Sequence, residues 1–304
     1  MAKELLALQV APGRVVRIGL EDGAVRTLVA DAGPAPDGIT VDRGTVYWTT
    51  MGTPTSDPAT PGEAGLDFSR RNGGLHAFDL DTGARRDMAP AGSLTTGKQL
   101  TDDGAGWLYW GDREGHRVSR IRTDGTGLAD LMVTPAEDGV SGECVGVAVD
   151  RARGHLYWTQ KGPSKGGLGR IFRAGLELPA GEDAGHRSDV ELLWSGLPEP
   201  VDLHLDGDWL YWTDRGAPPY GNTLNRAPLP APGDPGRPPQ ILADGFAEAI
   251  GLAVDRTAGL VYVGDLGGRL RAVPLPEGPA ADQAPREIAA LPHPLTGLCL
   301  LPDA

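Results

Sequence analysis

The segment Gly146-Val147-Ala148-Val149-Asp150, followed after a short turn by Tyr157-Trp158-Thr159-Gln160, is one copy of a two-part pattern that recurs along the 304-residue chain. The Tyr-Trp tetrapeptide begins at residues 47, 109, 157 and 211, and a degenerate copy, Tyr-Val-Gly-Asp, begins at 262. Successive copies therefore lie 62, 48, 54 and 51 residues apart. Repeats of this length are typical of the blades of a β-propeller.

A strand-like run precedes each tetrapeptide and begins at Gly38, Gln99, Gly146, Asp202 and Gly251. Each run alternates small and large residues, as a strand with two differently packed faces does, and the turn after it predicts a hairpin. Further strands are predicted at 74–80, 117–122, 169–174, 223–227 and 268–273, with fourth strands such as 190–194 and 239–242. Each repeat therefore predicts a four-stranded antiparallel blade.

The last blade is split between the two ends of the chain. The run 297–301 has no tetrapeptide after it, and the segments 4–10, 15–20 and 26–30 supply the three missing strands. Joining the ends removes two open sheet edges. We predict an all-β, six-bladed propeller that forms a single domain over residues 1–304.

Composition and charge narrow the classes of function. The 45 glycines and 27 prolines suit tight turns. The net charge of −13 disfavours nucleic acid and anionic membrane surfaces as partners. With two cysteines, Cys144 and Cys299, and no apolar leader resembling a signal peptide, we expect a cytoplasmic protein. The composition, rich in Ala, Gly, Pro and Arg, indicates a GC-rich bacterial genome.

The five tetrapeptides, each with its preceding strand, resemble the YWTD repeats of the low-density lipoprotein receptor propeller, over nearly the whole chain. The resemblance implies that the Tyr and Trp side chains pack between blades. The receptor propellers are extracellular and flanked by disulfide-rich modules. Because this sequence shows neither feature, the resemblance does not carry their partners over.

The topology predicts that one face of the propeller bears both the starts of the inner strands and the long loops at 50–72, 160–167 and 214–222. Long loops carry function more often than short hairpins do. We expect the loops to contribute Phe68, Arg70 and Tyr220 to a ligand site. The polar residues at the strand starts are expected to surround the same central mouth: Asp37, Lys98, Gln99, Glu199, Glu248 and His293.

Two residues of the fourth blade break the repeat. Asp202 stands where four blades have Gly, and His204 stands where the others have Thr, Ala or Cys. Together with Glu143 they are candidate acid–base residues, because clustered carboxylates raise one another's pKa. Alternatively, Asp202 and His204 are solvated in the channel or pair with each other, or the carboxylates hold a cation such as Ca²⁺. No cofactor is indicated.

Two functions remain open from the sequence. One is a small-molecule enzyme or binding protein, since six-bladed propellers of the gluconolactonase/regucalcin and strictosidine synthase-like families are similar overall. Lactonases of that type hold a divalent cation with Glu, Asn and Asp, but no Asn begins an inner strand here. The resemblance therefore does not carry that metal site over, and a site without metal that uses Asp202, His204 and Glu143 stays an alternative. The other is a non-catalytic scaffold for a protein or peptide. A deep pocket lined by Asp202, His204 and loop aromatics would favour the first.

Overall fold

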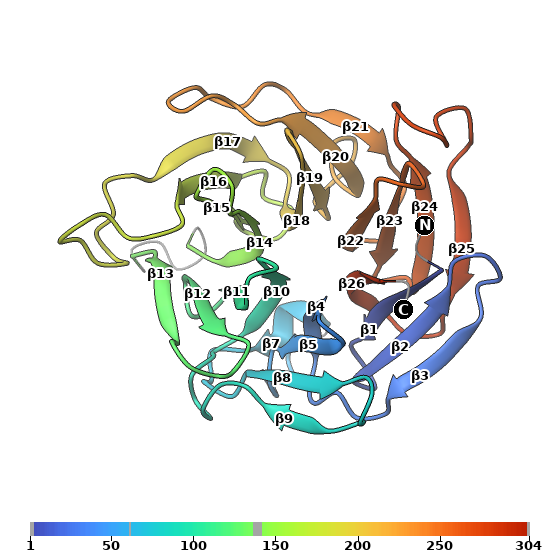
Figure 1. Ribbon diagram of the computed structural model, residues 1–304, viewed down its shortest axis with the longest axis horizontal. Helices are drawn as coiled ribbons and strands as arrows, with labels where there is room; N and C mark the ends of the chain where they lie inside the picture. The colour runs from blue at the N-terminus through green and yellow to red at the C-terminus, as the bar shows by residue number, and fades with distance from the viewer. Residues whose placement is uncertain (1–2, 61, 136–141, 303–304) are drawn as a thin grey trace.

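The computed structural model describes residues 3–60, 62–135 and 142–302. Six four-stranded antiparallel sheets stand around a central axis, each sheet being one blade (Figure 1). The predicted six-bladed propeller is confirmed. Alternating side chains of each strand pack against the two neighbouring blades, which is why the repeat alternates in size.

The strands of each blade follow one another from the axis outward. Blade 1 contains β4 (Pro36–Asp42), β5 (Thr45–Thr50), β8 (Gly74–Asp79) and β9 (Arg85–Asp87). Blade 2 contains β10 (Gly97–Asp102), β11 (Trp107–Asp112), β12 (Arg117–Arg122) and β13 (Ala129–Val133). Blade 3 contains β14 (Cys144–Asp150), β15 (His155–Gln160), β16 (Gly169–Gly175) and β17 (Glu191–Leu197).

The second half of the ring repeats this order. Blade 4 contains β18 (Pro200–Asp206), β19 (Trp209–Asp214), β20 (Thr223–Pro228) and β21 (Gln240–Ala243). Blade 5 contains β22 (Ala249–Asp255), β23 (Leu260–Asp265), β24 (Arg269–Pro274) and β25 (Arg286–Ala290). Blade 6 contains β26 (Leu295–Leu301), β1 (Glu4–Gln9), β2 (Arg14–Gly19) and β3 (Val25–Val29).

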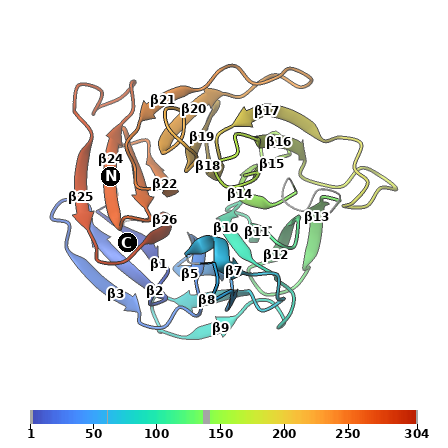
Figure 2. The same ribbon diagram turned by 180° about the vertical axis from the view of Figure 1, so that it is seen from behind.

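Blade 6 closes the ring with both ends of the chain, as the sequence predicts. The C-terminal strand β26 pairs antiparallel with β1, and Leu6 lies opposite Cys299. Figure 2, the view from behind, shows the N-terminal blue strands and red β26 side by side in this blade. The pairing of β26 with β1 joins the two chain ends in one four-stranded sheet, so neither end is left as an isolated strand.

The aromatic residues of the repeats fill the junctions between blades. Trp48, Trp110, Trp158 and Trp212 are at most 1% exposed. Trp48, for example, packs against Leu6 and Leu8 of blade 6. Aromatic side chains of this size contribute large buried areas, so these positions stabilise the ring.

The third residue of the repeat ties neighbouring blades together. The Thr49 hydroxyl accepts from the Gly38 amide at 2.9 Å and donates to the Lys98 carbonyl oxygen of blade 2 at 2.6 Å. Thr159 makes the same pair of bonds, to Gly146 at 2.7 Å and to Val201 at 2.9 Å. This polar crosslink holds the inner strands in register around the axis.

The two faces of the propeller differ. The long-loop face carries the starts of the inner strands and the loops 51–73, 161–168 and 215–222, and the short-hairpin face carries the turns that end the inner strands. The first of these loops folds into a hairpin of β6 (Thr55–Ser56) and β7 (Leu66–Asp67) with a 3₁₀ turn, η1 (Glu63–Gly65). In both views this hairpin lies close to the centre of the ring of blades.

Candidate functional site

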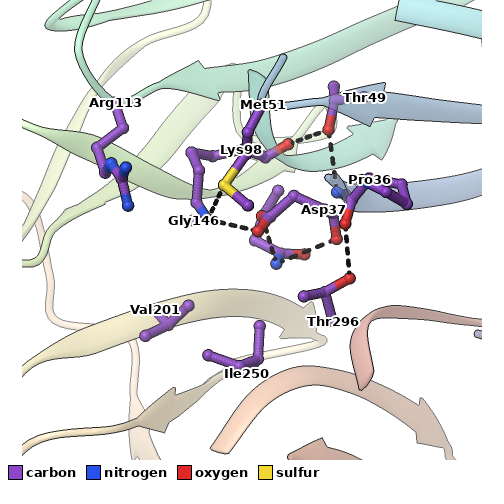
Figure 3. A network of polar contacts seen from close by, with 12 residues as sticks. Pro36, Asp37, Thr49, Met51, Lys98, Arg113, Gly146, Val201, Ile250 and Thr296 are labelled. Atoms are coloured by element: carbon purple, nitrogen blue, oxygen red, sulfur yellow. Dashed lines mark hydrogen bonds and ion pairs between the residues drawn. The ribbon is translucent and has the colours of Figure 1, made fainter. Parts of the chain in front are cut away.

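Buried residues close the long-loop end of the channel. Val145, Val201 and Ile250, the second residues of three inner strands, form an apolar cluster and are 1–3% exposed. Asp37 and Lys98 hold the same position in blades 1 and 2 and are also buried. Figure 3 shows Asp37 and Lys98 directed toward each other, with Val201 and Ile250 across from them. These side chains leave no open mouth at this end.

Asp37, Lys98 and Gln99 bind one another. The Lys98 ammonium donates to Asp37 Oδ2 and lies 3.4 Å from the sulfur of Met51. Gln99 Nε2 donates to Asp37 Oδ1 at 3.0 Å. Burial lowers the pKa of Lys98, while the Asp37 carboxylate opposes that shift. The structure brings these three predicted ligand-binding residues together, but as a closed ionic cluster.

The acidic residues at the other strand starts are also paired with cations. Glu143 lies 2.8 Å from the Lys161 ammonium. Glu199 is fully buried and accepts from Arg215 Nε at 2.8 Å and from the Lys165 backbone amide at 2.9 Å. The surrounding carboxylates raise the pKa of Arg215 further above its ordinary value. We use the name ionic belt for this set of paired side chains: Glu63, Glu143, Lys161, Lys165, Glu199, Arg215 and Glu248.

The ionic belt extends to the hairpin of blade 1. Arg215 donates to both carboxylate oxygens of Glu63 in η1, at 3.1 and 3.2 Å, and Lys165 lies 3.2 Å from Glu248. Since η1 belongs to blade 1 and Arg215 to blade 4, this contact spans the long-loop face. Of the carboxylates considered for Ca²⁺, Glu143, Glu199 and Glu248 thus have Lys or Arg partners. Within the described residues, no group of three His, Cys, Asp or Glu side chains is arranged to hold a metal.

The remaining loop residues do not meet at one site. Phe68 is buried beneath the Arg113 guanidinium, 5.4 Å from its ring centre. Tyr220 is 69% exposed, and Arg70 is exposed as well. His293 is partly buried at the start of blade 6. Their side chains line none of the cavity described next.

A cavity of about 310 Å³ occupies the channel beyond the closed end. The third to sixth residues of the inner strands line it, Asp202, His204 and Gln99 among them. The first four residues of all six inner strands are buried, and exposure begins only further along, in five of them. The cavity therefore opens on the short-hairpin face. Its lining lacks the loop aromatics that the sequence had suggested.

Asp202 joins blades 4 and 5 at the inner end of the cavity. Its Oδ2 accepts from the Leu252 amide at 3.0 Å and its Oδ1 accepts from the Leu203 amide at 2.9 Å. In blades 1, 3, 5 and 6 a Gly stands here, and a Cβ on it would press against the next blade's backbone. Burial raises the pKa of Asp202 to about 7, although both amides favour its ionised form.

His204 lines the cavity two residues further along β18. Among the described residues, its imidazole has no hydrogen-bond partner, so it does not pair with Asp202. Burial lowers its pKa, and the Asp206 carboxylate opposes that shift. The ring is therefore neutral at neutral pH, with one nitrogen able to donate and the other able to accept a hydrogen bond.

One polar group of the cavity escapes the sequence reasoning. Asp102, in blade 2, lines the cavity and accepts from the Thr40 hydroxyl at 2.6 Å and from the Gly104 amide at 2.9 Å. Most blades have an aliphatic residue at this position: Val41, Val149, Leu205, Val254 and Leu300. That departure from the repeat is a signal by which Asp102 could have been found.

Glu143, the third candidate acid–base residue, lies outside the cavity. It sits before β14 at the long-loop face, in the ionic belt. Its neighbour Cys144 is fully buried, and burial raises the pKa of the thiol to about 12, which suits packing rather than nucleophilic attack. The structure therefore unites Asp202 and His204 but not Glu143.

Comparison with known proteins places the chain among YWTD propellers. It is 40% identical, over 285 residues, to the low-density lipoprotein receptor-related protein 1 of Pyricularia oryzae, a match that covers 88% of this chain and 86% of that protein. It is 37% identical to the 3-hydroxyacyl-CoA dehydrogenase-like protein LAM1 of Cochliobolus heterostrophus, over 85% of this chain. The match covers 55% of LAM1, about half its length. No family model matches the sequence.

Solved structures agree on the fold. A chain from the crystal structure of a nidogen/laminin complex superposes with a TM-score of 0.67 over 97% of both chains, at 17% identity. Regucalcin, a calcium-binding protein of Agrobacterium tumefaciens, gives 0.57 over 88% of this chain and 79% of its own, also at 17% identity. At such identities the likeness concerns the fold alone.

Both curated relatives are fungal, so a bacterial origin stays a prediction, as does a cytoplasmic location. In the described part of the chain, no helix is long and apolar enough to cross a membrane. The repeat, the six closed blades and the 40% identity over most of both sequences lead to one conclusion: this chain belongs to the family of low-density lipoprotein receptor-type YWTD β-propellers.

Proposed function

We propose that the protein binds a small molecule in the central channel, that the ligand enters from the short-hairpin face, and that Asp202 and His204 contact it. The observation that carries the proposal is the free imidazole of His204 beside a cavity of about 310 Å³. The ring is partly exposed in the cavity and has no hydrogen-bond partner among the described residues, so both nitrogens are free to bond a ligand. Small-molecule sites are typically concave, with few polar groups.

This proposal changes the side of access that the sequence suggested. The long-loop end is filled by the Asp37–Lys98 pair and the apolar cluster behind it. The short-hairpin end is where exposure of the inner strands rises. The same arrangement supports chemistry as an extension of binding: a neutral imidazole near pH 7 is a suitable general base. In that role His204 acts alone, since Asp202 is held by two amides.

A screen of small fragments tests the proposal, with amide and imidazole NMR shifts as the readout. Bound fragments are expected to shift signals of His204 and Leu252 and to leave the ionic belt unchanged. His204→Ala, which installs the residue that blades 3 and 5 carry, should fold normally and lose binding. Cys299→Ala, at the corresponding position of blade 6, is the matched control and should retain it. Shifts confined to the long-loop face would contradict the proposal.

A second candidate function, docking of a protein on the long-loop face, is favoured by a different observation. Leu168 and Tyr220 are 60% and 69% exposed on two of its loops, and exposed apolar and aromatic residues mark many interfaces. Leu168→Ala with Tyr220→Ala should then abolish binding of a partner while leaving channel binding intact. If a partner binds the wild-type protein and the double variant with the same affinity, this face is not the docking site.

A further inference from the structure

We propose that the ligand of the channel is a small organic cation with a short apolar body, such as a protonated alkylamine. This inference rests on the proposed channel site and adds the chemical class of its ligand. It follows from which groups line the cavity, which of them are charged, and how they are distributed among the blades.

The charged groups of the cavity lining have one sign. The carboxylates of Asp102 and Asp202 line it, and among the described residues no Lys or Arg side chain does. Each carboxylate oxygen of Asp202 accepts one backbone amide, as does Oδ1 of Asp102. Because an ionised carboxylate offers about four acceptor sites, both retain capacity for a further donor. An ammonium group carries only donors and matches them.

The nearest cation does not cancel this charge. Lys98 lies close enough to lower the pKa of Asp202, but Asp37 lies close enough to raise it, and Lys98 is bonded to Asp37. The two charges of this pair largely offset each other at the cavity. The charge that a ligand meets inside the channel therefore comes from Asp102 and Asp202.

The rim of the short-hairpin face is not the source of selectivity. Outside the cavity lining, aspartates end four of the inner strands, and arginines lie beside them: Arg43 near Asp42, Arg153 at Asp150 and Arg256 at Asp206. The net charge of −13 attracts cations only diffusely. Recognition must occur deeper, where low dielectric strengthens a charge pair.

The opposite wall of the cavity is apolar. Blades 5 and 6 contribute Leu252, Val254, Leu298 and Leu300 to it, while the polar groups come from blades 1, 2 and 4. A ligand that fits both sectors has a charged end and a hydrocarbon end. At about 30 Å³ per heavy atom, a figure taken from the volume of liquid water, the cavity has room for roughly ten heavy atoms. A metal ion would use neither the apolar wall nor this space.

Three probes with one carbon skeleton test the inference: isopentylammonium, isopentanol and isovalerate, which are cationic, neutral and anionic at pH 7.5. Binding is measured by calorimetry and located by NMR shifts of channel residues. The ammonium is expected to bind at least about tenfold more tightly than the alcohol, the gain typical of a hydrogen bond to a charged group. Isovalerate should bind most weakly.

Asp102→Asn and Asp202→Asn are each expected to weaken ammonium binding about tenfold or more. Asp208→Asn, an equal charge change on the exposed rim, should leave it unchanged. Asp202 also supports blade packing, so Asp202→Asn could fail to fold. In that case Asp102→Asn and the three probes on the wild-type protein test the inference.

If the alcohol or the acid binds in the channel as tightly as the amine, the inference that the ligand is a cation is wrong, but the channel site itself still stands. No binding by any of the three probes would also overturn this inference, and the fragment screen would then judge the channel site separately.

Discussion

The Thr49 hydroxyl donates a hydrogen bond to the carbonyl oxygen of Lys98 at 2.6 Å, and so joins the second strand of blade 1 to the inner strand of blade 2. The same hydroxyl accepts from the Gly38 amide within its own blade. One oxygen thus satisfies two buried backbone groups that belong to different sheets. Blades 3 and 4 repeat the arrangement with Thr159 and Thr213.

Thr49→Val should destabilise the propeller, because valine keeps the shape of the side chain and leaves both buried backbone groups unsatisfied. The expected loss in the free energy of unfolding is about 1–3 kcal/mol. Urea denaturation followed by tryptophan fluorescence measures it. Thr45→Val is the matched control on the same strand, because the Thr45 side chain has no hydrogen-bond partner within the described part of the chain. It should change stability by less than about 0.5 kcal/mol. Equal effects of the two changes would contradict the crosslinking role.

Lys98→Met should destabilise the protein more strongly, because it leaves the Asp37 carboxylate buried without its cation. Breaking a buried pair in this way costs about 3–5 kcal/mol. The double variant Lys98→Met/Asp37→Asn removes both charges and retains an acceptor for Gln99, so it should recover part of that loss. A double-mutant cycle by chemical denaturation measures the coupling. Strictly additive losses would show that the pair does not act as a unit.

The stability of the protein should carry a pH dependence from Asp202. Its pKa is about 7 when folded and near 4 in an unfolded chain. Between these values the folded state holds a proton that the unfolded state releases, so this group's contribution to the free energy of unfolding falls as pH rises from 4 to 7. The slope is at most about 1.4 kcal/mol per pH unit.

Asp202→Asn removes that titration, so the difference between wild-type and variant stability isolates it from other groups. Asp214, whose pKa burial also raises to about 7, contributes to both proteins and cancels. Guanidinium denaturation at half-unit steps of pH provides the curve. The exposed Asp208→Asn should leave the wild-type profile intact. A wild-type-minus-Asp202→Asn difference that is flat from pH 4 to 7, or that rises, would refute the expected direction.

The two thiols should differ in reactivity. Cys299 lines the cavity and is partly exposed, whereas Cys144 is fully buried. Burial raises the pKa of both, so both react slowly. The small reagent methyl methanethiosulfonate should modify Cys299 first, and a bulky disulfide reagent should modify neither while the protein is folded. Peptide mapping by mass spectrometry reports the order. Earlier labelling of Cys144 would be inconsistent with a channel open on the short-hairpin face.

The sequence alone located part of the candidate site and missed the rest. Asp202 and His204 stand out in the sequence because they replace small residues at fixed points of a repeat, and both line the cavity. Asp102 carries the same kind of deviation one position further along and was missed. Asp37, Lys98 and Glu199 resembled ligand-binding groups only because their partners, which lie far from them along the chain, cannot be identified from the sequence.

The sequence by itself determined the blades, their number, the closure by both chain ends and the buried role of the Tyr-Trp pairs. These follow from periodic local patterns, and a propeller contacts only neighbouring repeats, so local patterns suffice. Only the tertiary structure decided which end of the channel is open. That depends on whether charged side chains from different blades meet and neutralise one another, as Lys98 does with Asp37 and Arg215 with Glu63, and such distances are not encoded in spacing along the chain.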